Sequence, residues 1–103
     1  MRILVVSDTH GDLRSLIKAV DAQRKAEIIV HCGDGEEQQR FLKDNYKDKM
    51  IVAVRGNCDW NSFFPSKEIF KACGKTIFVT HGHLYDAKSG LYRITSAARE
   101  AGA

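Results

Sequence analysis

The sequence predicts an α/β fold built in layers, a mixed β-sheet or sandwich flanked by helices. Two observations support this prediction: short segments rich in isoleucine and valine recur along the chain, and segments with helical apolar spacing stand between them. This alternation favours at least partly parallel strands, because a crossover helix is the usual connection between parallel strands. The four expected strands are Ile3 to Val6, Glu27 to Val30, Met50 to Val54 and Thr76 to Val79.

The segment between the first two strands predicts an amphipathic helix, because its apolar residues recur at i, i+3, i+4 and i+7. These residues are Leu13, Leu16, Ile17 and Val20. A second and more polar helix is expected over residues 36–46, and its inward-facing residues are Phe41, Leu42 and Tyr46. Residues 89–101 predict a third helix. Residues 68–73 predict a further strand, which turns back through Gly74 into the last of the four strands as a hairpin.

Length and composition limit the class of protein before any motif is considered. The 103 residues suffice for one small domain, and the apolar and charged fractions are those of an ordinary folded chain. The net charge is only +3 and basic residues alternate with acidic ones, so nucleic-acid binding through a basic patch is not expected. The apolar runs are too short to cross a membrane, and no secretory signal is visible. The three cysteines lack CxxC spacing, which favours a reducing cytoplasm, and we predict Cys32 and Cys73 to be small buried residues.

Polar residues and glycines follow each of the four strands. These segments are Ser7 to Gly11, His31 to Gly35, Arg55 to Asp59 and Thr80 to His83. Ligands of such folds bind beyond the carboxyl ends of the strands, and glycine permits a close approach of the backbone. We therefore expect the four segments to converge on one site at one edge of one sheet.

The residue types in these segments indicate a metal site. Carboxylates suit hard divalent cations and imidazoles suit Mn, Fe, Ni and Zn, so a mixed shell points to a transition metal. Asp8 and His10 are two positions apart, which would place both side chains on one face of an extended segment. A structural zinc site is not expected, because no thiolate pair has ligand spacing. A nucleotide-binding domain is the weaker alternative, since neither GxGxxG nor GxxxxGK[ST] occurs.

The ordered motifs resemble those of the calcineurin-like metallophosphoesterases. The matching residues are Asp8-x-His10, Gly33-Asp34, Gly56-Asn57 and His81-Gly82-His83. The third motif continues as Gly-Asn-Cys-Asp, which is similar to the small bacterial and archaeal phosphodiesterases of this family. The resemblance covers nearly the whole chain.

The resemblance implies a hydrolase that uses two divalent metal ions, with Mn as the first expectation and Fe, Ni or Zn as alternatives. A water or hydroxide between the ions would attack the phosphorus of a small phosphate ester, and this branch of the family implies a diester. By motif, Asp8 and His10 bind the first ion, Asp34 bridges both, and Asn57 and His81 bind the second. Thr9, His31 and Asp59 are expected to orient these ligands through hydrogen bonds.

Two positions depart from the family pattern. Cys58 stands where many relatives carry a histidine that acts as general acid, so it is the candidate catalytic residue, although a thiol needs a tuned pKa for that role. The family's closing Gly-His-x-His motif has no counterpart before Ala103. We therefore expect residues 1–103 to form a single domain that is the N-terminal part of a longer one. The alternatives are a strand supplied by a partner, and a non-catalytic protein-binding scaffold of the same fold, as in a retromer subunit.

Several further residues keep two interpretations. His31 is expected to be a buried histidine with a satisfied hydrogen bond and not a ligand, and His83 to have a structural or substrate-side role. Trp60, Phe63 and Phe64 are expected in the core, the alternative being a wall against the substrate. An unpaired sheet edge would favour association of the chain with itself, so a homo-oligomer is one alternative for its state in solution.

Overall fold

Three short parallel strands form the centre of the molecule. The computed structural model describes residues 2–57, 59, 64–81 and 92–103. Its first sheet consists of β1 (Ile3–Val6), β2 (Ile28–His31) and β3 (Met50–Ala53), in the order β1-β2-β3. Both strand pairs are parallel, and the register aligns Val6 with His31 and His31 with Ala53. The carboxyl ends of all three strands therefore meet at one edge of this sheet.

The remaining strands form a second sheet. It is an antiparallel hairpin of β4 (Lys67–Ala72) and β5 (Lys75–Thr80). The expectation that the fourth apolar strand would end at the edge of the same sheet as the first three is wrong, because this strand, β5, pairs with β4. The physical reason is the length of the connection. Two residues between β4 and β5 suffice for an antiparallel hairpin, whereas a parallel neighbour needs a crossover of roughly a dozen residues.

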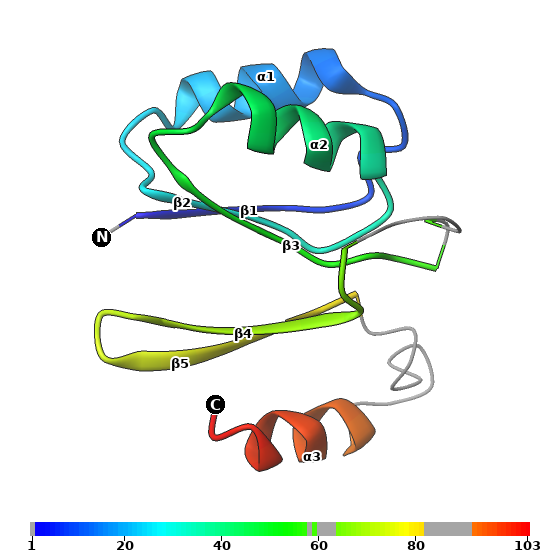
Figure 1. The fold of residues 1–103 in the computed structure, drawn as a ribbon, viewed down its shortest axis with the longest axis vertical. Helices are drawn as coiled ribbons and strands as arrows, with labels where there is room; N and C mark the ends of the chain where they lie inside the picture. The colour runs from blue at the N-terminus through cyan, green and yellow to red at the C-terminus, as the bar shows by residue number, and fades with distance from the viewer. Residues whose placement is uncertain (1, 58, 60–63, 82–91) are drawn as a thin grey trace.

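The elements stack in layers, which confirms the layered α/β fold predicted from the sequence. Helices α1 (Leu13–Ala22) and α2 (Glu36–Asn45) cover one face of the first sheet. The second sheet lies on the opposite side, and α3 (Tyr92–Glu100) lies beyond it (Figure 1). None of the described helices is long and apolar enough to cross a bilayer.

Alternation along β2 divides the core into two parts. Between the sheets, the buried apolar residues are Ile28, Val30, Val52, Val54, Phe70, Ala72 and Val79. Between the first sheet and the helices, they are Leu16, Val20, Ile29 and Leu42. Because successive side chains of a strand point to opposite faces, His31 lies on the same side of the sheet as Ile29, toward the helices. This side places its imidazole against α2.

The two long helices differ in how well their inward faces are predicted. Helix α1 buries Leu16 and Val20 as its stripe requires, and the Asp12 side chain caps its start by accepting a hydrogen bond from the Ser15 amide at 3.1 Å. In α2 the predicted inward positions of Leu42 and Tyr46 are confirmed, since Tyr46 packs against the core cluster that contains Leu42, whereas Phe41 does not belong to this cluster. The buried residues are Gln38, Gln39 and Leu42, while Phe41 and Tyr46 are half-buried and contact each other edge to face. Polar groups are buried here because they have partners beneath the helix, which are described below.

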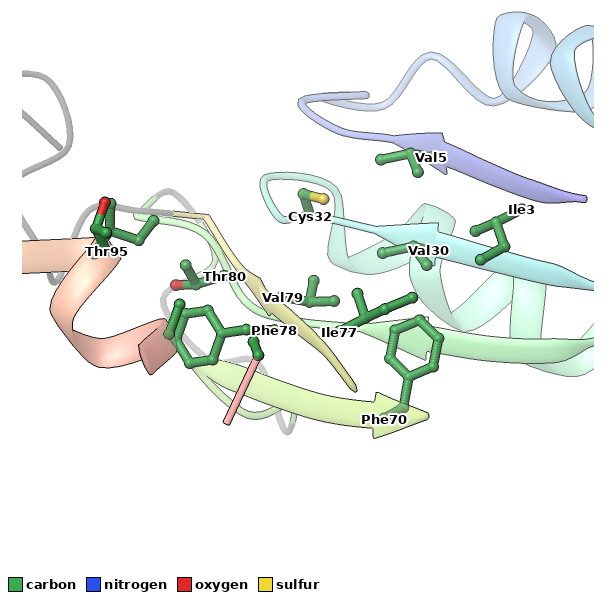
Figure 2. Close-up of a pocket in the computed structure, with 13 residues that line it drawn as sticks. Ile3, Val5, Val30, Cys32, Phe70, Ile77, Phe78, Val79, Thr80 and Thr95 are labelled. Atoms are coloured by element: carbon green, nitrogen blue, oxygen red, sulfur yellow. The ribbon is translucent and has the colours of Figure 1, made fainter. Parts of the chain in front are cut away.

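The two sheets leave an apolar cavity of about 580 Å³ between them on the β1 side. Its lining comes chiefly from β5 and α3, with smaller contributions from β1, β2 and β4 (Figure 2). Half-buried Cys32 lines this cavity, and burial raises the pKa of its thiol, with a smaller contribution from Asp8. Val5 is 62% exposed, so the contact between the sheets is open on this side.

Cys73 provides a test of the hairpin turn. It is exposed, contrary to the expectation of a buried residue, because the turn projects from the sheet end. Its φ of 51° lies in the left-handed region, which asparagine tolerates better than most side chains. The variant Cys73→Asn is expected to raise the free energy of unfolding by about 0.5 kcal/mol, measured by urea denaturation. Cys73→Val is the matched control, since a β-branched side chain is disfavoured at positive φ. A valine variant as stable as the asparagine variant would contradict this account of the turn.

Candidate metal centre

Two turns at the carboxyl edge of the first sheet are held together by their backbones. The amide of Asp8 donates to the Gly33 carbonyl at 2.8 Å, and the amide of His10 donates to the Asp34 carbonyl at 3.2 Å. Asp8, His10 and Asp34 all have positive φ, with values of 54°, 42° and 60°. The expected extended geometry of the first turn is therefore wrong. The side chains converge because the backbone is held in a rarely populated conformation, a feature that clusters at functional sites.

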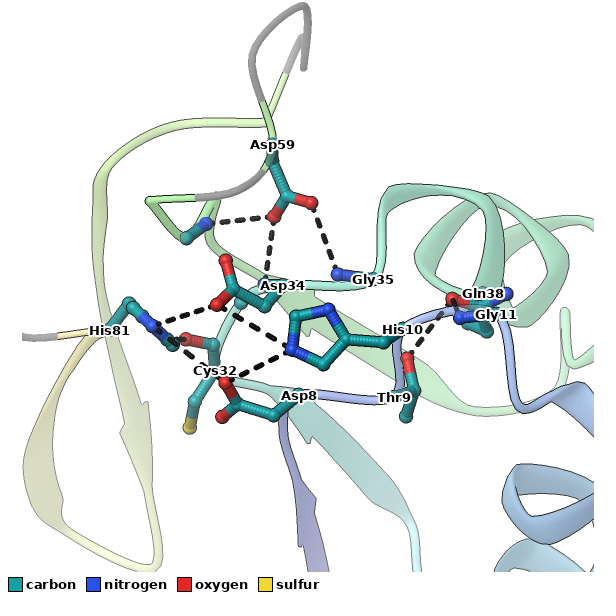
Figure 3. A network of polar contacts seen from close by, with 12 residues as sticks. Asp8, Thr9, His10, Gly11, Cys32, Asp34, Gly35, Gln38, Asp59 and His81 are labelled. Atoms are coloured by element: carbon teal, nitrogen blue, oxygen red, sulfur yellow. Dashed lines mark hydrogen bonds and ion pairs between the residues drawn. The ribbon is translucent and has the colours of Figure 1, made fainter.

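The carboxylates and imidazoles of these turns meet in a small cluster (Figure 3). The Nε2 atom of His10 lies 3.6 Å from Oδ1 of Asp8 and 3.8 Å from Oδ2 of Asp34. The Nε2 atom of His81 lies 3.9 Å and 3.3 Å from the same two oxygens. One ligand atom each from Asp8, Asp34 and His81 lies within 4.8 Å of the others, which is the arrangement of groups that could share a metal ion.

His81 reaches this cluster from the second sheet. It follows β5, and its Nδ1 atom lies 2.9 Å from the Cys32 carbonyl oxygen. A carbonyl oxygen can only accept, so Nδ1 carries the proton and donates it. Nε2 is then the ring nitrogen that faces Asp8 and Asp34, on the side where a metal ion would bind. The second sheet thus contributes to the same site, although it does not share an edge with the first.

The carboxylate of Asp59 joins the turn after β3 to the turn after β2, which carries Asp34. Its Oδ2 atom accepts hydrogen bonds from the amides of Asp34 at 2.9 Å and Gly56 at 2.8 Å. Its Oδ1 atom accepts from the amide of Gly35 at 3.1 Å. Asp59 is buried, and a carboxylate with three amide donors is fully compensated there. It fixes the backbone that presents Asp34, as the sequence-based expectation of an orienting role requires.

Glycine allows two of these turns to touch. A Cβ atom on Gly56 would lie 2.5 Å from the Asp34 amide nitrogen and 2.7 Å from its Cγ atom. A Cβ atom on Gly33, whose φ is +116°, would lie 2.8 Å from the backbone of Gly56 and 2.9 Å from Nδ1 of His81. Both positions therefore exclude side chains, and the packing at each runs directly against a candidate ligand.

The groups around Asp8 change the pKa of its carboxyl. Partial burial raises the pKa of its carboxyl, but four other effects outweigh it and leave the pKa lowered. In order, these are a hydrogen bond with Ser7, the charge of His81, a hydrogen bond with Asp34 and the charge of His10. Asp8 is therefore held as a carboxylate, the form that binds a cation.

Comparison with known proteins identifies the family. A family model described as the calcineurin-like phosphoesterase superfamily domain matches residues 1–103. The chain belongs to this superfamily. Metallophosphoesterase relatives are found among curated proteins: probable metallophosphoesterase YsnB of Bacillus subtilis (strain 168) is 34% identical over 107 residues, which cover 100% of this chain and 59% of YsnB. Phosphodiesterase MJ0936 of Methanocaldococcus jannaschii is 27% identical over 115 residues, which cover 91% of this chain and 69% of MJ0936.

Solved structures of phosphoesterases share the fold. A conserved uncharacterized protein of Streptococcus pneumoniae TIGR4, described as a predicted phosphoesterase, matches with a TM-score of 0.80 and 28% identity. The match covers 98% of this chain and 56% of that structure. The phosphoesterase Yfce of E. coli matches with a TM-score of 0.61 and 25% identity, over 85% of this chain and 61% of that one. The chain thus spans between about half and two thirds of these relatives' length.

Four of the five predicted ligands meet at this site. Asp8, His10, Asp34 and His81 lie together, as described above. Asn57 is exposed and lies in the turn directly after Gly56. Its role as a ligand stays a prediction. The predictions for Cys58, Trp60, Phe63 and His83 lie outside the described residues, and Phe64 is half-buried with the Lys43 ammonium 5.2 Å from its ring centre.

Two buried residues beside the candidate metal centre were not predicted from the sequence. Gln38 and Gln39 are buried at the start of α2, where they bond to residues of the turns and of β2. A signal for them exists in the helical period, since Gln38 and Gln39 precede Leu42 by four and three positions on one face. The two glutamines were not expected in the core, because polar residues of a helix usually face solvent.

Proposed function

We propose that the protein is a metal-dependent phosphoesterase that hydrolyses phosphodiesters or related small phosphate esters. One observation carries the proposal: two carboxylates and an imidazole, Asp8, Asp34 and His81, offer ligand atoms within 4.8 Å of one another at the carboxyl edge of a parallel sheet. His10 adds a second imidazole at less than 4 Å from both carboxylates. Membership of the phosphoesterase superfamily supports the reaction class.

The residues present fit a divalent transition metal. Two carboxylates with two imidazoles form the mixed oxygen and nitrogen shell that Mn, Fe, Ni and Zn accept. Nδ1 of His81 donates to the Cys32 carbonyl, so Nε2 is the ring nitrogen that faces the carboxylates, and Asp8 is held ionised. We propose Mn(II) as the native ion.

Membership of the superfamily and the presence of two imidazoles support a site in which two ions share one carboxylate. Oδ2 of Asp34 lies between the two imidazoles, 3.8 Å from His10 and 3.3 Å from His81. In the proposed assignment, Asp8 and His10 would hold one ion, His81 and Asn57 the other, and Asp34 both. When bound, such ions lower the pKa of a water and neutralise charge on the phosphate oxygens.

The chain's own groups set the geometry of this site. Asp59 holds the Asp34 turn by three backbone amides, and the Cys32 carbonyl orients the His81 ring. Buried Asp34 is only 4% exposed, which limits competing water on its side of the cluster. Positioned ligands of this kind raise metal affinity, because the turns lose little freedom on binding.

Metal titration of the purified protein tests the proposal. Calorimetry with MnCl₂ is expected to show binding to the wild type and at least a roughly 100-fold weaker affinity for Asp34→Asn, which removes the shared ligand. Turnover of bis-p-nitrophenyl phosphate is expected to require Mn(II) and to be lost in Asp34→Asn.

Asp44→Asn is the matched control, since this carboxylate is exposed on the solvent side of α2. It should bind Mn(II) and turn over substrate as the wild type does. A wild-type protein that binds no transition metal would exclude the proposed function. Metal binding without turnover would favour the alternative of a non-catalytic scaffold.

A further inference from the structure

We infer that His31 is a positioning residue: its neutral imidazole, fixed as the Nε2–H tautomer, joins the turn that carries Asp8 and His10 to the turn that carries Asp34. The inference deepens the proposed function and rests on it for its consequence, metal affinity. Its structural content does not depend on a metal. His31 is completely buried and lies beneath both turns, at the end of β2.

One side of the ring is a hydrogen-bond acceptor. The backbone amide of Gly33 points at Nδ1 at 3.1 Å, and a backbone amide can only donate. The Nε2 atom of Gln39 lies 3.0 Å from the same nitrogen. This side-chain nitrogen also donates to the Val54 carbonyl at 2.7 Å, which fixes the orientation of the amide. Nδ1 therefore has no proton, and it holds the residue directly before Asp34.

The other side of the ring is a donor. The Nε2 atom lies 3.1 Å from Oγ1 of Thr9. The Thr9 hydroxyl has one proton, and it donates this proton to Oε1 of Gln38 at 3.1 Å. The same Oε1 atom accepts from the backbone amide of Gly11 at 3.1 Å, which identifies it as an oxygen. Thr9 must then accept from His31, so Nε2 carries the proton.

Both ends of the ring thus require the same tautomer, from independent donors and acceptors. The chain of bonds runs from the Gly33 amide through His31 and Thr9 to Gln38, and it meets the Gly11 amide there. Two candidate ligands, Asp8 and His10, flank Thr9 in the sequence, and a third follows Gly33. A shift of the imidazole would therefore move both turns together.

The packing around Gly35 shows that this arrangement is closely fitted. A Cβ atom on Gly35 would overlap Oγ1 of Thr9 and lie 3.0 Å from Nε2 of His31 and 3.1 Å from Oε1 of Gln38. The φ of Gly35 is 170°, an extended value open to any residue, so the backbone conformation does not require glycine here. The hydrogen-bonded groups beneath it do.

The electrostatics agree with a neutral ring. Burial lowers the pKa of His31, and His81 adds to this effect, while Asp59, Asp8 and Asp34 oppose it without reversing it. A positively charged ring would need a proton on Nδ1, where two N–H groups already point. The neutral form is the one that the surrounding donors and acceptors can satisfy.

The test uses a pair of variants at Thr9, which is less buried than His31 and less important for folding. Thr9→Val keeps the shape but removes the acceptor of the Nε2 proton, and Thr9→Ser keeps the hydroxyl. In metal-free protein, long-range ¹H–¹⁵N spectra are expected to show His31 of the wild type and of Thr9→Ser as the Nε2–H tautomer. In Thr9→Val, the signals of the His31 ring and of the Gly33 amide are expected to shift, although neither residue is adjacent to position 9 in the sequence. Calorimetry is expected to show Mn(II) affinity lowered about 10- to 100-fold in Thr9→Val and largely restored in Thr9→Ser.

These outcomes separate the inference from the proposed function. A Nδ1–H tautomer or a charged His31 in the wild type would overturn the inference, and so would an unchanged Gly33 amide in Thr9→Val. Mn(II) affinity equal to that of the wild type in Thr9→Val, at equal folded fraction, would also overturn it, because a purely structural role would change stability alone. If the wild type bound no Mn(II), the proposed function would fail, and the tautomer and the coupled shift would still decide whether His31 joins the turns.

Discussion

Replacing Asp59 with alanine is expected to lower the free energy of unfolding by roughly 3–5 kcal/mol, because three buried amide donors lose one charged acceptor. These donors belong to Asp34, Gly35 and Gly56, at 2.8–3.1 Å from the carboxylate oxygens. The turn that presents Asp34 would lose its connection to the turn after β3. Mn(II) affinity is therefore expected to fall by at least about tenfold, beyond the loss of stability.

Urea denaturation of metal-free protein measures the first effect, and calorimetry the second. Asp48→Ala is the matched control, since this aspartate is exposed in the turn before β3, and its effect should stay within about 0.5 kcal/mol. Asp59→Asn should recover part of the stability, because its oxygen can still accept while its NH₂ group faces a donor. If Asp59→Ala were no less stable than Asp48→Ala, the carboxylate would not hold these turns together.

The substitution Gly56→Ala is expected to have a large effect on the site for a different reason, namely lack of space. The new methyl group would lie 2.5 Å from the Asp34 amide nitrogen and 2.7 Å from its Cγ atom, so Asp34 or the turn must move. Overpacking of this kind costs about 1–3 kcal/mol of stability. Turnover of bis-p-nitrophenyl phosphate is expected to fall about 100-fold, since a shift of about 1 Å in a reacting geometry has an effect of that size.

Gly74→Ala separates the effect on the site from the effect on stability. Gly74 has a φ of +75° in the hairpin turn and no atom within 4 Å of a Cβ position. Alanine there should cost about 1 kcal/mol through backbone strain, yet leave Mn(II) affinity and turnover of the folded protein unchanged. Equal loss of turnover per folded molecule in Gly56→Ala and Gly74→Ala would contradict the assignment of Gly56 to the site.

The strands and helices of this protein are largely encoded locally. Short runs of isoleucine and valine identify β1 and β2, and apolar residues of helical period identify α1, each to within a residue or two, because these patterns are local in the sequence. The order of the motifs, from Asp8 to His81, likewise indicates the family and the reaction class from the sequence alone. These features depend on residue type and spacing, which a sequence states directly.

Other features depend on which segments lie side by side in space. The pairing of β5 with β4, and not with the first sheet, was decided by the hairpin turn, and His81 still reaches Asp34 from that second sheet. The burial of Gln39 follows from the donors and acceptors that it meets beneath α2, on His31 and Val54.

The candidate metal centre therefore has two origins. The sequence by itself determined which chemical groups are available, Asp8, His10, Asp34 and His81, because carboxylate and imidazole are properties of single residues. Only the tertiary structure decided that these groups meet, through left-handed backbone at three of them and through the hydrogen bonds of Asp59 and the Cys32 carbonyl. The physical reason is that ligand geometry depends on contacts between turns that are distant in sequence, and no local pattern contains them.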